Sequence, residues 1–207
     1  MYLARHGQTE SNLLNRYSGF SSEPVTRVGR AQMMDLGTRL KTCGIAEIWT
    51  SAVARARESA DVVSRILGLP VHVDPRLNEM GLGAWQGLTE AEVGQIFPEE
   101  YKIWCTAPDR LDLEGRESLL ALSDRVNLAV VDAAVRPRPV LCITHVAPIR
   151  VAVIRALGLP LRYYRRVHVG NGDCLVISGN QIGATRLGEK HSLRDDLPPC
   201  ETEGWMS

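Results

Sequence analysis

The chain lacks net charge and is poor in aromatic residues. Its 24 lysines and arginines balance 24 aspartates and glutamates, and 5% of its 207 residues are aromatic. A neutral balance gives no support for non-specific binding to nucleic acid or to an anionic membrane. No apolar run is long enough to span a bilayer, and no signal-type segment stands before the first strand-like residues. We therefore expect a cytoplasmic protein.

Paired cysteines and several phosphate-chemistry motifs are also missing. The 5 cysteines are odd in number, and no two of them form a C-x-x-C pair. This pattern favours free thiols over a disulfide framework or a zinc site. The sequence has no C-x5-R loop, no D-x-D after a first strand and no G-x-x-x-x-G-K-[ST] loop. These absences argue against a cysteine nucleophile, an aspartate nucleophile and a P-loop.

What is present is typical of a globular α/β protein. With 44% hydrophobic and 23% charged residues, the chain fits one domain with a substantial core. Strand-like and helix-like segments alternate, which predicts a three-layer α/β/α sandwich with a mostly parallel sheet. Strands are expected at 2–4, 45–50, 71–73 and 139–144, a hairpin at 174–178 and 181–187, and helices at 26–41, 53–67, 117–135 and 148–157, with shorter ones beginning near 89 and 98. We predict a single domain over 1–187 and a loosely held tail over 188–207.

The first chemical signal is the tripeptide Arg5-His6-Gly7 at the end of the first strand. Gly7 permits a tight turn and a close approach of backbone. The histidine is thereby placed at a carboxyl edge of the sheet, where open α/β folds bind ligands. Arg5 would bring a fork of donors to a tetrahedral anion, and Asn12 an amide N–H. Taken alone, such a tripeptide is more often an ordinary polar turn.

Three further residues occupy comparable positions. Arg55 follows a strand at the start of a helix, whose first amides favour an anion. Glu79 precedes a glycine-rich loop that contains Trp85, and His145 ends the most apolar strand. Each has an ordinary structural reading by itself: a solvated helix charge, a simple loop and a hydrogen-bonded core histidine.

Together, these segments resemble the histidine phosphatase superfamily, the phosphoglycerate mutase-like group, in order and spacing. Residues 16–20 with Thr26, Gly29 and Gln32, and residues 115–118, match secondary motifs of that family. The resemblance covers nearly the whole chain except the tail. It implies a phosphoglycerate mutase-like fold. We expect no cofactor, and no metal requirement, because Arg5, Arg55, His6 and His145 already provide the positive field that a metal would otherwise supply.

The resemblance also implies roles. His6 would attack phosphorus and become a phosphohistidine, which requires a neutral ring whose other nitrogen donates to a backbone carbonyl. Arg5, Arg55 and His145 would surround the three equatorial oxygens of the phosphoryl group. Glu79 would protonate the leaving oxygen and then activate water, which requires a raised pKa. Further contacts to the phosphoester are expected from Gly7, Asn12, Gly19 and Val146.

Two positions depart from the usual family pattern. Val146-Ala147-Pro148 follows His145 where glycines are usual. The N–H of Val146 still suits a phosphate oxygen, but its β-branched side chain narrows the backbone freedom and reshapes the pocket floor. Ala52 stands where proline is common, a change that we expect to be harmless.

We predict that the segment from about 80 to 118 forms a small cap. Its sequence helps to distinguish a phosphatase from a mutase. It lacks the longer insertion and the tyrosine near the acid that cofactor-dependent phosphoglycerate mutases carry, and residues 83–87 are similar to the phosphatase branch. We predict a metal-independent phosphomonoesterase for a small molecule, with no nucleic acid or membrane partner. A mutase and a catalytically inactive binding protein are the alternatives, and a homodimer stays open. Contacts to the leaving group are expected from Tyr17, Phe20, Trp85 and Trp104, with core packing as the equal alternative.

Overall fold

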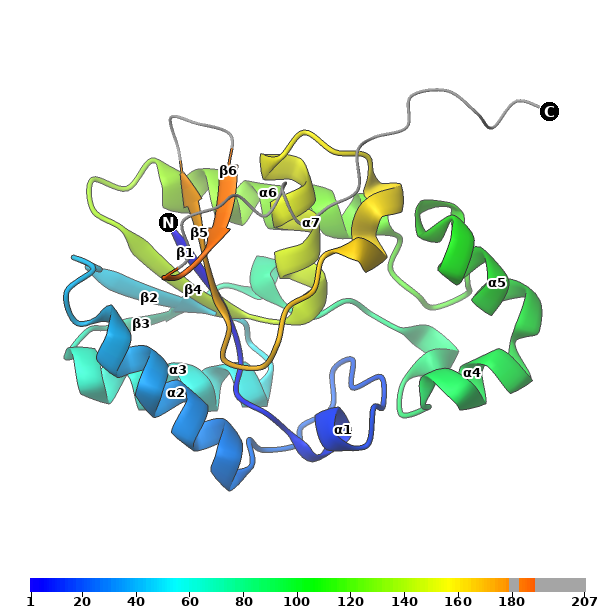
Figure 1. The fold of residues 1–207 in the computed structure, drawn as a ribbon, viewed down its shortest axis with the longest axis horizontal. Helices are drawn as coiled ribbons and strands as arrows, with labels where there is room; N and C mark the ends of the chain where they lie inside the picture. The colour runs from blue at the N-terminus through cyan, green and yellow to red at the C-terminus, as the bar shows by residue number, and fades with distance from the viewer. Residues whose placement is uncertain (179–182, 189–207) are drawn as a thin grey trace.

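The computed structural model describes residues 1–178 and 183–188, and a six-stranded sheet forms its centre (Figure 1). The strand order is β3-β2-β4-β1-β5-β6. Parallel pairing joins β3 (Val71–Val73), β2 (Glu47–Thr50), β4 (Val140–Thr144) and β1 (Tyr2–Arg5). β5 (Cys174–Ser178) runs antiparallel to β1, and β6 (Gly183–Arg186) antiparallel to β5. The sheet is therefore mostly parallel, as predicted.

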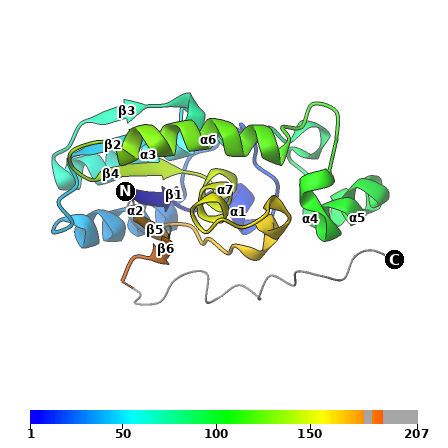
Figure 2. The same ribbon diagram turned by 90° about the horizontal axis from the view of Figure 1, so that it is seen from above.

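Helices cover both faces of this sheet (Figure 2). α2 (Arg27–Leu40) packs with α3 (Ala54–Leu67), and α6 (Leu119–Ala134) packs with α7 (Val146–Ala156). The strand β4 shows why two layers form, because successive side chains of a strand point to opposite faces. Its Cys142 belongs to the core cluster beneath α6 and α7, whereas Leu141 belongs to the one beneath α2 and α3. The three-layer sandwich predicted from the sequence is confirmed.

The smaller helices lie near one end of the sandwich. α1 (Glu10–Leu13) follows β1, while α4 (Glu90–Ile96) and α5 (Pro98–Thr106) project beyond the sheet (Figure 1). Short 3-10 turns occupy 75–77, 83–85, 108–110 and 161–166. α4 begins with the predicted capping box, in which Thr89 and Glu92 exchange hydrogen bonds. Both α4 and α5 lie within the segment predicted as a cap.

Several boundaries differ from the sequence prediction. The helix predicted to begin at Pro148 begins at Val146, because His145 has the extended backbone of an N-cap and proline is tolerated in a first helical turn. α1 has no counterpart in the prediction, and its 4 residues are too short to carry a periodic signal. Residues 179 and 180, where the two strands of the predicted hairpin would turn, and nearly all of the predicted tail lie outside the described residues.

Two other expectations concern the whole molecule. The described cysteines, Cys43, Cys105, Cys142 and Cys174, all carry free thiols, as predicted. Within residues 1–178 and 183–188, no helix combines the length and the apolar character needed to cross a membrane.

Candidate active site

The carboxyl ends of β1, β2 and β4 bring the first group of candidate residues together. In the parallel register Arg5 pairs with Thr144, and the ladder continues past β1 because the N–H of His6 donates to the carbonyl of Thr144 at 2.9 Å. His6 and His145 therefore leave neighbouring strands at the same level. Their ring centroids lie 5.0 Å apart in an edge-to-face arrangement, and both side chains are buried.

His6 has a single tautomer that fits its contacts. Its Nδ1 lies 2.7 Å from the carbonyl oxygen of Gly7, which can only accept, so Nδ1 carries the proton. Its Nε2 accepts a hydrogen bond from Nε of Arg55 at 3.1 Å and therefore holds a lone pair. Burial, reinforced by Arg55 and Arg5, holds the pKa of His6 well below its ordinary value. The ring is neutral, with a nucleophilic nitrogen turned toward a cation.

The arginines supply fixed positive charge at this place. Arg55 is fully buried, and its terminal nitrogens donate to the carbonyls of Gly19 and Ser21 at 2.8 and 3.3 Å. Arg5 donates from one terminal nitrogen to the carbonyl of Val169 at 2.7 Å, and its Nε has no acceptor among the described residues. Burial lowers the pKa of Arg5 to about 10, which still leaves it charged at neutral pH. Both guanidinium groups thus retain charge for an anion.

Glu79 places a carboxyl group within electrostatic reach of Arg5 and Arg55. It is 7% exposed, and its Oε1 accepts the N–H groups of Met80 at 2.9 Å and of Ala147 at 3.3 Å. Burial raises the pKa of Glu79 above its ordinary value, although Arg55 and those backbone donors pull it down. A carboxyl group with a raised pKa is suited to donate a proton near neutral pH.

His145 is held in place by Ser51, the residue that follows β2. Its Nε2 lies 2.8 Å from Oγ of Ser51, at the end of β2, and its buried Nδ1 has no partner among the described residues. Burial, together with Arg55 and His6, holds the pKa of His145 well below its ordinary value. A nucleophilic nitrogen, fixed cations and a carboxyl group that can hold a proton are the parts that phosphoryl transfer through a histidine needs.

A comparison with known families decides the relationship. The profile described as "Histidine phosphatase superfamily (branch 1)" matches residues 1–187. The chain belongs to this superfamily. Its phosphoglycerate mutase-like fold and its membership of a family of phosphoryl-transfer enzymes agree with the sequence analysis.

Named relatives of this superfamily member include both mutases and phosphatases. It is 33% identical over 178 residues to "Probable phosphoglycerate mutase GpmB" of Citrobacter koseri, covering 83% of this chain and 80% of that one. Among solved structures, Bacillus stearothermophilus YhfR superposes with a TM-score of 0.82 at 28% identity, covering 92% and 96% of the two chains. A putative alpha-ribazole-5'-P phosphatase from Escherichia coli has a TM-score of 0.77 at 27% identity, covering 89% and 92%.

The other predicted phosphate contacts lie around the same edge. Asn12 uses its Oδ1 to accept from the N–H of Thr9 at 3.1 Å and from Asn171 at 2.8 Å, which leaves its amide N–H2 to donate. Gly7 approaches α2 so closely that a Cβ there would lie 2.3 Å from the carbonyl oxygen of Gly29. Val146 is the first helical residue of α7, so its N–H has no intrahelical partner and suits an anion.

The predicted aromatic contacts fall into two groups. Trp85 and Trp104 are 0% and 3% exposed and lie edge to face with centroids 6.0 Å apart, while the ring of Tyr17 is 5.8 Å from that of Trp85. These rings pack with each other. Phe20, in contrast, is 51% exposed and lies between the two carbonyls that Arg55 binds. Of the four predicted aromatic contacts, Phe20 is the exposed one, whereas Tyr17 is partly buried.

Sequence reasoning missed several residues that hold the site in place. Arg125 of α6 donates to the carbonyl oxygens of Arg76, Asn78 and Glu79 and pairs with Glu117, so it fixes the loop that carries the acid. Asn171 fixes Asn12 and also donates to the carbonyl of His6 at 3.2 Å. A single arginine in a long helix gives no signal in the sequence. Asn171 stands between two glycines, a turn pattern that could have marked it.

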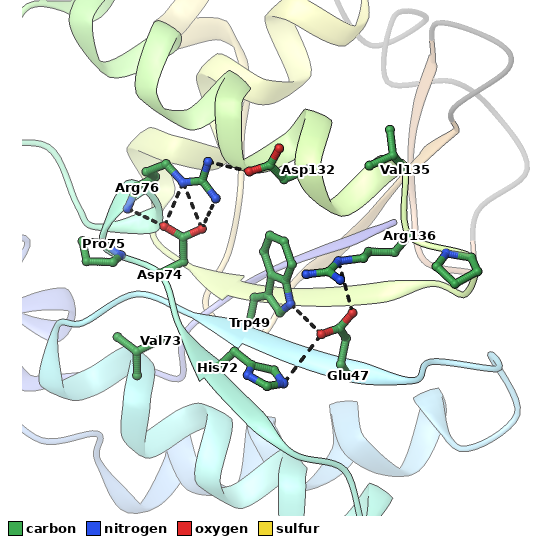
Figure 3. Close-up of a pocket in the computed structure, with 11 residues that line it drawn as sticks. Glu47, Trp49, His72, Val73, Asp74, Pro75, Arg76, Asp132, Val135 and Arg136 are labelled. Atoms are coloured by element: carbon green, nitrogen blue, oxygen red, sulfur yellow. Dashed lines mark hydrogen bonds and ion pairs between the residues drawn. The ribbon is translucent and has the colours of Figure 1, made fainter.

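A groove of about 740 Å³, with none of the predicted catalytic residues in its lining, lies between β2, β3 and the end of α6 (Figure 3). Its charged side chains pair with one another, because Arg76 pairs with Asp74 and Asp132, and Glu47 pairs with Arg136. Among the described residues, no group of three or more histidine, cysteine, aspartate or glutamate side chains is placed to hold a metal ion.

Proposed function

We propose that this chain hydrolyses small-molecule phosphomonoesters through a phosphohistidine formed on His6. The observation that carries the proposal is the Nε2 lone pair of His6, which faces the buried cation Arg55, while the same arginine also interacts with the buried carboxyl group of Glu79. A neutral histidine with its lone pair exposed to an electrophile is a competent nucleophile. The raised pKa of Glu79 supports its role as the proton donor.

In the first step, the phosphate group replaces the hydrogen bond from Arg55 to His6. The guanidinium groups of Arg5 and Arg55 then bind the equatorial oxygens, and Nε2 of His6 forms a bond to phosphorus as the bond to the leaving oxygen breaks. Protonated Glu79 gives its proton to that oxygen, so the alcohol leaves neutral. The carboxylate that remains faces the phosphohistidine.

In the second step, the Glu79 carboxylate takes a proton from a water molecule as the water oxygen attacks phosphorus. The bond between phosphorus and Nε2 breaks, which returns the lone pair to His6 and releases inorganic phosphate. Both steps use the same charges and the same acid-base group, as microscopic reversibility requires. Because fixed arginine charges replace the role that a metal ion has in other phosphatases, the proposal includes no metal.

Turnover of p-nitrophenyl phosphate by the purified protein tests the proposal. We expect turnover that withstands thorough treatment with EDTA and that vanadate inhibits, because vanadate adopts the five-coordinate geometry of the transferring phosphoryl group. Absence of turnover would favour the alternative that the chain is a catalytically inactive binding protein of the same fold. Loss of activity on chelation, with rescue by a divalent ion, would contradict the metal-independent mechanism.

A mutase is the second candidate, and the similarity to relatives described as probable phosphoglycerate mutases favours it. A mutase returns the phosphoryl group to another hydroxyl, whereas a phosphatase gives it to water. Phosphorus NMR of 3-phosphoglycerate with the enzyme separates the two, since isomerisation and release of inorganic phosphate give different signals. The cytoplasmic location, the small-molecule partner and the oligomeric state remain predictions.

A further inference from the structure

A chain of hydrogen bonds behind His145 determines where that histidine carries its proton. The chain begins at Asn78, whose Oδ1 lies 2.8 Å from the backbone N–H of Ala52. That contact fixes the amide orientation, because a nitrogen in the same place would face another donor. Oδ1 of Asn78 is therefore an acceptor.

Ser51 continues the chain. Its Oγ lies 3.0 Å from Oδ1 of Asn78, and two oxygens at this distance need a proton between them. The amide oxygen has none, so the hydroxyl proton of Ser51 points to Asn78. Only the lone pairs of Oγ then remain for its other two neighbours. One of these is the N–H of Val53 at 3.1 Å, and the other is Nε2 of His145 at 2.8 Å.

His145 must consequently donate from Nε2, and its neutral form has a bare Nδ1. The two histidines of the site thus have opposite tautomers, since His6 carries its proton on Nδ1. Nδ1 of His145 is buried and has no partner within residues 1–178 and 183–188. It is the ring atom left for a ligand, and a bare nitrogen repels a fully ionised phosphate oxygen.

We propose that Ser51 and Asn78 are positioning residues that hold neutral His145 as the Nε2–H tautomer, so that a phosphate dianion binds together with one proton at Nδ1. A phosphate monoanion would supply that proton itself: its O–H bond breaks, the N–H bond of Nδ1 forms, and no other bond changes. This inference rests on the proposed function, because it concerns the phosphate bound at the same site.

The charges around His145 support uptake of the proton only when a ligand is present. Burial and the cations Arg55, Arg5 and Arg125, with His6 beside them, disfavour an imidazolium ion in the free protein. Glu79 is an acidic side chain of this site, and burial raises its pKa. A bound phosphate brings negative charge against the ring and reverses this balance.

Binding of inorganic phosphate measured by calorimetry tests the proposal. At about pH 8, phosphate is mostly a dianion, and titrations in two buffers with different ionisation enthalpies give the number of protons taken up. We expect about one proton for the wild-type protein. Glu79→Gln should keep this value, which assigns the proton to His145; loss of uptake in this variant would assign it to Glu79 and overturn the proposal.

Asn78→Leu breaks the chain, because the Ser51 hydroxyl becomes free to donate to Nε2. Neutral His145 can then carry its proton on Nδ1 and donate to the dianion directly, so uptake should fall toward zero. Asn78→Asp keeps an acceptor and should keep the uptake. Ser59→Ala removes another buried hydroxyl, one that bonds Gly7 instead of His145, and should also leave the proton number unchanged.

Nitrogen-15 NMR of the free wild-type protein gives a second test that needs no variant. We expect a protonated Nε2 for His145 and a protonated Nδ1 for His6. The same tautomer in both rings, or phosphate binding by the wild type without proton uptake, would overturn the inference while leaving the hydrolase proposal intact. Failure of phosphate to bind any of these proteins would instead count against the proposed function.

Discussion

The edge of the sheet and the cap segment over 80–118 both contain buried polar atoms without partners among the described residues, but in different surroundings. At the edge, these atoms are Nε of Arg5 and Nδ1 of His145, beside the nucleophile. In the cap, Nε of Arg116 is such an atom, and its guanidinium lies 4.6 Å from the ring centroid of Trp104. The edge is arranged for a small anion, whereas the cap is a packed aromatic cluster. We infer that catalysis belongs to the first region and substrate choice to the surface of the second.

The largest effect should come from the edge. His6→Ala should reduce turnover of every phosphoester by about 10⁴-fold or more, because no other described side chain offers a lone pair in the same place. Rapid acid quenching is harsh on phosphohistidine, so the wild-type intermediate should be trapped in base, where it is stable, and should be absent in the variant. His72→Ala, at an exposed histidine, is the matched control. An alanine variant that still becomes phosphorylated would remove His6 from its role.

Glu79→Gln should separate substrates by their leaving groups. For sugar or alkyl phosphates, whose leaving oxygen needs a proton, we expect kcat to fall by about 10²- to 10³-fold. For p-nitrophenyl phosphate, the rate of the first step should fall much less, because its leaving oxygen scarcely needs a proton. Measuring single turnovers isolates this step from the later attack of water. Equal losses on both substrates would assign the proton to another group.

The buried histidines should also shape the dependence of stability on pH. Unfolded histidines take up protons below about pH 6.5, whereas His6 and His145 stay neutral in the fold because their pKa values are lowered. The unfolded state then binds more protons, so the free energy of unfolding falls as pH decreases, by up to about 1.4 kcal/mol per pH unit for each histidine. Glu79, with its raised pKa, contributes in the opposite sense, since its stabilisation is lost as pH rises.

Urea unfolding at a series of pH values between about 6.5 and 5 checks this expectation. His145→Gln should flatten the slope relative to the wild type, whatever its effect on absolute stability. His168→Gln, at an exposed position, is the control and should leave the slope unchanged. An unaltered slope in His145→Gln would mean that this histidine titrates alike in the folded and unfolded states.

The same contrast between regions explains what could be predicted from the sequence. At the edge, His6 and His145 follow adjacent strands. An apolar run followed by a histidine is therefore a sufficient signal to predict both positions. The support from Arg125 and Asn171 depends on tertiary packing that no local pattern encodes. In the cap, the sequence shows which residues are aromatic but not whether each ring packs in the core or faces a ligand, because the same residue types serve both purposes. Burial of Trp85 and exposure of Phe20 required the structure.

The smallest effect should sharpen the role of the surface where the cap meets Phe20, which lies outside the cap in the loop before α2. Phe20 lines a pocket of about 420 Å³ together with Asn78, Gly81 and Arg116, next to the loop of the acid. Phe20→Ala should therefore raise KM for a leaving group with a flat ring by up to about tenfold, the value of one stacking contact, and leave KM for glycerol phosphate unchanged. Its stability should change little, because the ring is half exposed.

Trp85→Ala is the informative counterpart, since its buried ring packs against Tyr17, Phe97 and Trp104. Loss of that packing should lower the free energy of unfolding by about 3–5 kcal/mol, with KM altered equally for flat and aliphatic leaving groups. Urea unfolding and KM measured on both substrate types give the two answers. The contrary result would be a Trp85→Ala variant that keeps the free energy of unfolding of the wild type and has a raised KM only for flat leaving groups. The Trp85 ring would then contact the ligand during turnover, and the cap could not be described as a packed aromatic cluster.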